Sequence, residues 1–161
     1  MSTDIRRVGY GHPDALRLIE EVQEEYVLRY GSRDETPLDP LMFELPGGSF
    51  FVGYLDGTPV ASGAWRRSGV SAFSTSRTAE IKRMYVVPAA RGRGLARAML
   101  AHLEADAAEH GAEAIVLESG LRQPEAIELY ESSGYTPIPS FGYYRFARLS
   151  RCFGRRLPTT T

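Results

Sequence analysis

The stretch MYVVPAARGRGLAR, residues Met84–Arg97, decides the fold of this chain. Its first four residues are apolar or aromatic, as in a strand, Pro88 stops that strand, and the last residues begin an amphipathic helix. Between them, Gly92 and Gly94 allow a tight turn and a close approach of the backbone to a ligand. The first amides of a helix have no partner within the helix and favour negative charge. The stretch therefore predicts a strand–turn–helix unit that holds phosphate.

The residues around the turn indicate which kind of phosphate-bearing ligand it can hold. A Walker loop would need a Lys-Ser or Lys-Thr pair at the start of the helix, and a dinucleotide fingerprint would need a third glycine where Arg97 stands. What remains is the pattern RxxGxA over Arg91–Ala96, preceded by EIKRMYV (Glu80–Val86) and followed by LYESSGY (Leu129–Tyr135). Taken together, these segments resemble the GNAT superfamily of N-acetyltransferases, in which this motif holds the pyrophosphate of acetyl-coenzyme A.

Length and composition are those of one domain. A chain of 161 residues can bury a substantial core, so we expect a single GNAT domain over residues 1–161. The net charge of −1 does not indicate a nucleic-acid partner. The single cysteine, Cys152, excludes an internal disulfide and a cysteine-based metal site, and His12, His102 and His110 are scattered without ligand spacing. We therefore expect no metal.

The chain has no pattern typical of membrane insertion or export. No charged-then-apolar segment opens it, and no apolar run approaches the ~18 residues needed to span a bilayer. We expect a cytoplasmic protein with no membrane partner. The sequence leaves a homodimer open.

Periodicity and turn signals predict a mixed sheet with helices. The expected strands are Ile5–Val8, Ser49–Leu55, Thr58–Arg67, Ala79–Val87, Ala114–Glu118, Thr136–Pro139 and Arg151–Leu157. The expected helices are Pro13–Gly31 with the apolar stripe Leu16, Ile19, Val22 and Tyr26, a short piece at Leu41–Glu44, Leu95–Gly111 and Pro124–Gly134. Asp56-Gly57 is a strong hairpin signal, and the strand–helix–strand crossover should make Ala114–Glu118 parallel to Ala79–Val87. The fold class is therefore α/β, with antiparallel strands first and a parallel crossover after them.

The resemblance implies one feature that periodicity cannot supply. In GNAT proteins the helices cover both faces of the sheet, and the two central parallel strands splay apart so that the pantetheine arm lies between them. Here the cleft would lie between Ala79–Val87 and Ala114–Ser119, with Gly120 easing the divergence. Met84 and Val86 would offer backbone groups to the pantetheine.

The resemblance also implies a set of cofactor-binding residues, with backbone amides acting first and arginines second. They are Met84, Tyr85, Val86, Arg91, Gly92, Arg93, Gly94, Leu95, Ala96 and Gln123. Gln123 stands where many relatives carry an asparagine, seven residues before Tyr130. Its longer amide can make the same type of hydrogen bond.

Acetyl transfer to an amine needs a group that removes a proton from the ammonium. Strand alternation should place Glu80, Lys82, Met84 and Val86 on one face, toward the cofactor. By resemblance, Glu80 would act as the general base, usually through water. The alternative is a carboxylate that only pairs with Lys82 or Arg83.

The departing thiolate needs a proton donor. A phenol that titrates near ~10 and a thiol that titrates near ~8.5 exchange protons efficiently. By resemblance, Tyr130 is the general acid that serves the sulfur of the cofactor. It also falls on an apolar helix face with Ala126 and Ile127, so it can be a core aromatic at the same time.

The acceptor is the least determined part. By resemblance, its site would be built by the first helix and the loop after it, by the Ser68–Arg77 loop and by the loop between the last two strands. The candidate residues are Tyr26, Tyr30, Asp34, Glu35, Tyr143, Tyr144, Arg145 and Arg148. We expect an enzyme that moves the acetyl group of acetyl-CoA directly, without Cys152, to a primary amine of a small molecule such as an amino acid or a polyamine. A protein or peptide N-terminal acetyltransferase and a non-catalytic CoA sensor are the alternatives.

Overall fold

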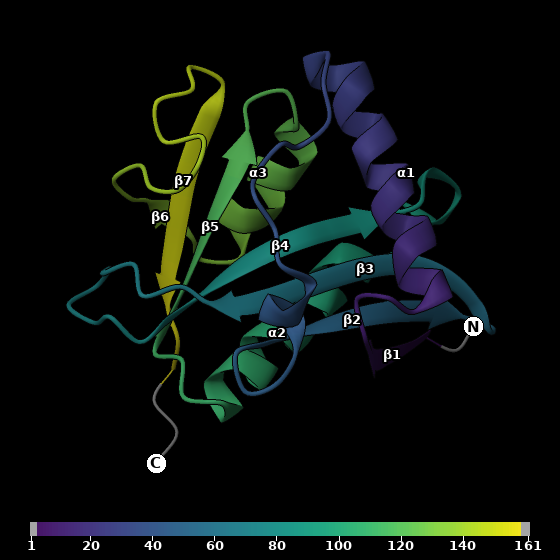
Figure 1. Ribbon diagram of the computed structural model, residues 1–161, viewed down its shortest axis with the longest axis horizontal. Coiled ribbons are helices and arrows are strands. Elements are labelled where there is room, and N and C mark those ends of the chain that lie inside the picture. The colour runs from purple at the N-terminus through teal and green to yellow at the C-terminus, as the bar shows by residue number, and fades with distance from the viewer. Residues whose placement is uncertain (1–2, 159–161) are drawn as a thin grey trace.

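A computed structural model describes residues 3–158 as one mixed sheet with helices on both faces (Figure 1). The seven strands lie in the order β1-β2-β3-β4-β5-β7-β6. They are β1 (Thr3–Val8), β2 (Gly48–Leu55), β3 (Thr58–Arg67), β4 (Thr78–Val86), β5 (Ala114–Gly120), β6 (Thr136–Pro137) and β7 (Ser150–Arg156). The helices are α1 (Pro13–Tyr30), α2 (Leu95–Glu109) and α3 (Pro124–Ser132), with short 3₁₀ turns η1 (Pro40–Phe43) and η2 (Pro88–Ala90).

The hairpin predicted at Asp56-Gly57 is confirmed. Both residues have positive φ, 50° and 82°, and β2 and β3 pair directly up to Leu55 and Thr58. Two successive positive φ values are the geometry of the tight turn that matches the twist of antiparallel strands, and the Asp-Gly pair adopts it at low cost. The hairpin sets the register of the antiparallel half of the sheet.

The central parallel pair separates, as the resemblance implied. Strands β4 and β5 pair only from Thr78 with Ala114 to Glu80 with Val116, and β5 stays paired with β7 up to Gly120. Figure 1 shows the two arrows diverging beyond that point. The second half of β4 therefore has one backbone edge that no strand within residues 3–158 covers.

A β-bulge interrupts β4 at Arg83. The register with β3 shifts between Ser62 and Ala64, so that Arg83 and Met84 together lie opposite Gly63. Arg83 has φ of 59°, a left-handed value that an L residue rarely adopts. A bulge of this kind adds one residue to one strand and reverses the faces of the residues that follow it.

The bulge corrects one expectation from the sequence. Ile81, before it, and Met84, after it, pack in the same core against α2, whereas Tyr85 packs in the core against α1. Strict alternation would have put Ile81 and Met84 on opposite faces. The expectation of one shared face is therefore wrong for the set Glu80, Lys82, Met84 and Val86.

The two larger cores pack the helices on the sheet. The core on one face packs α2 and α3 against the sheet, and the core on the other face packs α1. The buried stripe of α1 is Ala15, Leu18, Ile19 and Val22. Leu16 was expected in that stripe but is 48% exposed, because the buried face begins one residue earlier, at Ala15.

The loops at the two ends of the sheet have different roles. The Ser68–Arg77 loop precedes β4 and lies at the end where β4 and β5 are still paired. The strands open at the opposite end, beneath the loop after α1 and the loop before β7. No helix in the described part of the chain is long and apolar enough to cross a membrane.

Candidate active site

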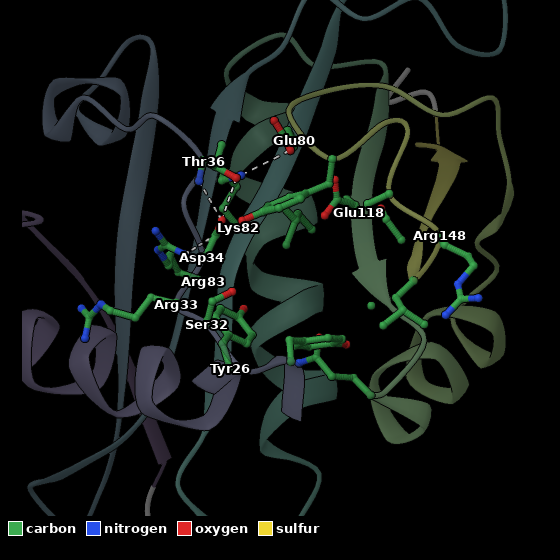
Figure 2. A pocket seen from close by; sticks show the side chains of 18 residues that line it. Tyr26, Ser32, Arg33, Asp34, Thr36, Glu80, Lys82, Arg83, Glu118 and Arg148 are labelled. Carbon is green, nitrogen blue, oxygen red and sulfur yellow. Dashed lines mark hydrogen bonds and ion pairs between the residues drawn. The ribbon is translucent and has the colours of Figure 1, made fainter. Parts of the chain in front are cut away.

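Two cavities meet where β4 and β5 separate. The turn-side cavity, of about 370 Å³, is lined by the end of β4, the turn before α2 and helix α3. The loop-side cavity, of about 450 Å³ and shown in Figure 2, is lined by the end of α1, the loop after it and the loop before β7. The residues that line both cavities are Tyr26, Ile81, Lys82, Arg83, Glu118 and Gln123. A reaction between two ligands, one in each cavity, would take place beside these residues.

The turn before α2 has the features of an anion cradle. Gly92 and Gly94 have φ of 81° and 77°, and a Cβ atom on either would meet nothing within 4 Å. Gly94 is the N-cap residue of α2 and provides no side chain to cap the first amides. Ala96 lines the cavity in this first turn. Open space, positive φ and uncapped amides together fit a pyrophosphate group.

The arginines of the turn differ in their placement. Arg91 lines the turn-side cavity, where its Nε donates to the Val86 carbonyl at 2.9 Å and its Nη2 contacts Glu25 at 2.8 Å. Arg97 also lines it and donates to the hydroxyls of Ser132 and Ser133.

Most of the predicted cofactor residues come together in this cavity. Those that line it are Met84, Tyr85, Val86, Arg91, Gly92, Gly94, Ala96 and Gln123. Arg93 is not among the lining residues, and the side chain of Leu95 is buried with Val60 and Ala90, so that Leu95 offers only its backbone. Gln123 lies at the junction, where its Oε1 accepts a hydrogen bond from the Tyr30 hydroxyl at 3.3 Å.

Tyr130 is both a core aromatic and a cavity residue. It is 6% exposed, packs with its ring 5.8 Å from that of Tyr135, and lines the turn-side cavity. Burial raises the pKa of the Tyr130 hydroxyl above its ordinary value, and the nearby Tyr26 raises it further. A phenol in this environment stays protonated at neutral pH, but the raised pKa also makes it a weaker acid than the ordinary phenol considered from the sequence.

Glu80 lines only the loop-side cavity and belongs to an ion-pair group. Its Oε1 accepts from Arg66 Nε at 3.1 Å and Nη2 at 2.9 Å, and its Oε2 lies 3.6 Å from the Lys82 ammonium. The pairing with Lys82 was one of the two interpretations from the sequence. Arg83 pairs instead with Asp34, at 2.8 Å. Arg66 was not anticipated, although it lies directly across from Glu80 on β3.

Glu118 is the residue that the sequence reasoning missed. It lies on β5 just beyond the last paired residue, Val116, and lines both cavities. Burial raises the pKa of Glu118 to about 7; Lys82 opposes this rise, and the negative charges of Asp34 and Glu80 add to it. A carboxylate that titrates near neutral pH is suited to accept a proton there. The only signal in the sequence is a glutamate at the open end of a buried strand.

The expected acceptor residues separate into two groups. The loop-side cavity is lined by Tyr26, Tyr30, Asp34, Tyr144 and Arg148 (Figure 2). Glu35, Tyr143 and Arg145 are not among its lining residues, and neither is any residue of the Ser68–Arg77 loop. That loop was expected at the acceptor site, but the strands open at the other end of the sheet.

Gly120 also leaves room for a side chain of α1. A Cβ atom at this position would lie 1.7 Å from the Tyr30 hydroxyl. The absence of a side chain therefore lets Tyr30 reach across from α1 to Gln123 and close one side of the loop-side cavity.

Cys152 is buried on β7 beside Glu118. It is 3% exposed, and burial raises the pKa of its thiol, so that little thiolate is present at neutral pH. Within residues 3–158, no group of three or more His, Cys, Asp or Glu side chains is placed to hold a metal ion.

The model of the acetyltransferase (GNAT) family matches residues 17–135, which include the turn, both cavities' shared residues and Tyr130. The chain belongs to the GNAT family. It is therefore an N-acetyltransferase that acts on acetyl-CoA, and the anion cradle at the start of α2 is the part of the fold that suits the pyrophosphate of that cosubstrate.

Individual GNAT relatives support this assignment. An IAA acetyltransferase of Azospirillum brasilense is 32% identical over 129 residues, 80% of this chain and 81% of that protein. The N-acetylaspartate synthetase of Homo sapiens is 29% identical over 124 residues, 77% of this chain but 39% of that protein.

Solved structures share the fold. A candidate acyl-CoA N-acyltransferase of Klebsiella pneumoniae superposes with a TM-score of 0.78 and 26% identity, covering 96% of this chain and 97% of that one. The PaiA N-acetyltransferase of Thermoplasma acidophilum, solved with coenzyme A, superposes with a TM-score of 0.71 over 97% of this chain and 99% of that one. At 14% identity, the second likeness concerns the fold alone.

Proposed function

We propose that this GNAT enzyme transfers the acetyl group of acetyl-CoA directly to a primary amine of a small molecule. The observation that carries the proposal is the meeting of two cavities beside Glu118, one with the anion cradle and one without. The loop-side cavity, at about 450 Å³, has the size of a small-molecule site. The names of the two curated relatives also indicate small-molecule products or substrates.

In this proposal the turn-side cavity binds the cosubstrate. The amides at the start of α2 hold the pyrophosphate, with Arg91 and Arg97 adding charge at the rim. The backbone edge of β4 at Met84 and Val86, which β5 leaves uncovered, pairs with the amide groups of the pantetheine arm. When bound, acetyl-CoA supplies the thioester whose acetyl group is transferred.

Glu118 is proposed as the general base. Its carboxylate accepts a proton from the acceptor ammonium, whose free pKa is near ~10, so that the neutral amine can attack the carbonyl carbon. Glu118 is favoured because it lines both cavities, whereas Glu80 lines only the loop-side cavity and is held by Arg66 at 2.9 Å. Glu80, which Arg66 and Lys82 already neutralise, stays the second candidate.

Tyr130 is proposed as the general acid. It lies on the turn-side of the junction, where the sulfur would leave, and burial keeps its hydroxyl protonated. As the carbon–sulfur bond breaks, the phenol donates its proton to the sulfur and CoA leaves as a thiol. The nitrogen loses its second proton as the amide forms, and this proton restores the tyrosinate through solvent. Glu118 releases the first proton to solvent, so that one proton is set free in each turnover.

The direct route is favoured over an acetylated cysteine. Cys152 is buried behind Glu118, and the raised pKa of its thiol makes it a weak nucleophile. Steady-state kinetics with both substrates varied should therefore give intersecting rather than parallel lines.

The test is a screen of pooled small amines and short peptides with acetyl-CoA. Thiol release is followed with a colorimetric reagent, and mass spectrometry identifies the acetylated product. Acceptor-dependent thiol release with small amines supports the proposal. Acetylation of peptides alone would make the protein a peptide N-terminal acetyltransferase. Tight acetyl-CoA binding without any acceptor-dependent release would make it a CoA sensor.

A further inference from the structure

We infer that the acceptor is an amine that also carries a carboxylate, as an amino acid does, and that Lys82 binds this carboxylate where the two cavities meet. The inference rests on the proposed function and deepens it, because it names the chemical class of the acceptor. It excludes simple amines and polyamines as preferred substrates.

The first argument is the position of Lys82 relative to the proposed base. Glu80 and Val116 are the last paired residues of β4 and β5, so Lys82 and Glu118 each lie two residues farther along their strands. Residues separated by two positions on a strand share a face, so both side chains lie on the face of the loop-side cavity. Figure 2 shows Lys82 and Glu118 at this cavity, and both residues also line the turn-side cavity. An amine held at Glu118 therefore has an ammonium group of the protein beside it.

The second argument is the weak partner of Lys82. The side chain is only 14% exposed, and its ammonium lies 3.6 Å from Glu80 Oε2. The other oxygen of Glu80 accepts two shorter contacts from Arg66, at 2.9 Å and 3.1 Å. One carboxylate thus serves two cations, and the arginine holds it more closely. A largely buried ammonium with a long, shared contact is stabilised by a further anion.

The third argument is the neighbouring Arg83, whose Nε has no acceptor among the described residues. Its side chain is 4% exposed and its Nη1 pairs with Asp34, but its Nε is buried and, among the described residues, has no hydrogen-bond partner. Arg83 lines both cavities next to Lys82. In ion pairs, the cations Arg66, Lys82 and Arg83 share Glu80 and Asp34, and Glu118 is the third carboxylate near them. Once Glu118 has taken the proton of the amine, a ligand carboxylate would balance the remaining positive charge, whereas a second ammonium on the ligand would add to it.

The inference is tested with matched acceptor pairs. Each pair is an amino acid and the amine that remains when its α-carboxylate is removed: L-leucine and isopentylamine, L-phenylalanine and 2-phenylethylamine, L-lysine and cadaverine. We expect kcat/KM for the preferred amino acid to exceed that of its partner amine by roughly ten- to a hundredfold, the effect of one charge-assisted contact. Equal or better use of the decarboxylated amines would overturn the inference.

The variant Lys82→Met locates the contact. It keeps most of the length of the side chain and removes the charge, so we expect the ratio of kcat/KM between the amino acid and its partner amine, measured at the pH optimum of each protein, to fall to near one. Arg17→Met is the matched control, because Arg17 is an exposed cation of α1 that lines neither cavity. A preference that survives in Lys82→Met would show that another group binds the carboxylate and would refute the assignment.

A binding measurement separates this inference from the proposed function. Calorimetry in the presence of CoA compares the N-acetyl amino acid with the N-acetyl amine of the same pair. Preferential binding of the carboxylate that Lys82→Met abolishes supports the inference even if no turnover occurs, in which case only the proposed function fails. Turnover without any carboxylate preference refutes the inference alone.

Discussion

Lys82 and Glu118 stand at the same level on the two strands of the separated pair, each two residues beyond the last paired residues, Glu80 and Val116. Their charges are opposite, and Lys82 is the charge that most lowers the pKa of Glu118, against the burial that raises it to about 7. The separation of β4 and β5 thus places a cation, Lys82, and a carboxylate whose pKa is about 7, Glu118, where the two cavities meet.

Glu118→Gln should lower kcat far more than Glu80→Gln. Removing a general base usually costs about 10²–10⁴-fold in rate, whereas the amide keeps the size of the side chain and leaves acetyl-CoA affinity nearly unchanged. Glu80→Gln instead removes the anion shared by Arg66 and Lys82, so it should mainly lower the melting temperature. Steady-state kinetics and thermal melts of both variants provide the comparison. The larger loss of kcat in Glu80→Gln would make Glu80 the base.

The pH profile should report the titration of Glu118. A base must be ionised, and because the pKa of Glu118 is raised from 4.5 to about 7, kcat/KM should rise as pH increases toward 7 and level off above it. Lys82→Met removes the charge that lowers this pKa, so the rising limb should move to higher pH. Initial rates between pH 5 and 9 for both proteins provide the measurement. If the rate instead rises around pH 4.5, the ordinary glutamate pKa, and Lys82→Met does not change this pH, the assignment of Glu118 as the base is contradicted.

Stability should respond to the same carboxyl group. A pKa that is raised in the folded state means that the folded protein binds this proton more tightly than the unfolded chain. The contribution of Glu118 to stability is therefore greatest below the ordinary value of 4.5 and is lost as pH rises toward about 7. Denaturant unfolding of wild type and Glu118→Gln across this range should show a difference that grows with pH in favour of the glutamine. A constant difference would refute the raised pKa.

Tyr130→Phe should separate the hydroxyl from the ring. The ring packs in the core beside Tyr135, so the phenylalanine variant should fold normally and keep its affinity for acetyl-CoA. Loss of the proton donor should lower kcat by about 10²–10⁴-fold with little change in KM. Kinetics beside a thermal melt test this. Near-normal turnover in a well-folded variant would leave Tyr130 as a core aromatic only.

Gly94→Glu should weaken acetyl-CoA binding more than Arg93→Ala. Gly94 has φ of 77° at the start of α2, and a glutamate there adds strain, bulk and negative charge at the anion cradle. We expect calorimetry to show a loss of roughly ten- to a hundredfold in affinity, that of a charged contact worth ~1.5–3 kcal/mol. Arg93 does not line the cavity, so Arg93→Ala should change the affinity little. Unchanged affinity of Gly94→Glu for acetyl-CoA would show that the anion cradle does not bind the pyrophosphate.

The sequence by itself determined the parts of the protein that depend on local backbone geometry. The hairpin at Asp56-Gly57 and the turn with Gly92 and Gly94 follow from residues that accept positive φ, and the helix after the turn follows from its apolar periodicity. The parallel crossover also followed, because the handedness and length of a strand–helix–strand unit leave few alternatives. The anion cradle is built from these local features, which is why the resemblance to the GNAT family could be seen in the sequence.

Only the tertiary structure decided which side chains meet. The bulge at Arg83 reverses the faces of β4, and no local pattern announces it, because it depends on the register with β3. The same holds for Glu118, which becomes a site residue only because β5 separates from β4 after Val116 and burial then raises its pKa. Burial and long-range register arise from packing between segments distant in sequence, and the free energy that shifts a proton or pairs a charge is set by those neighbours.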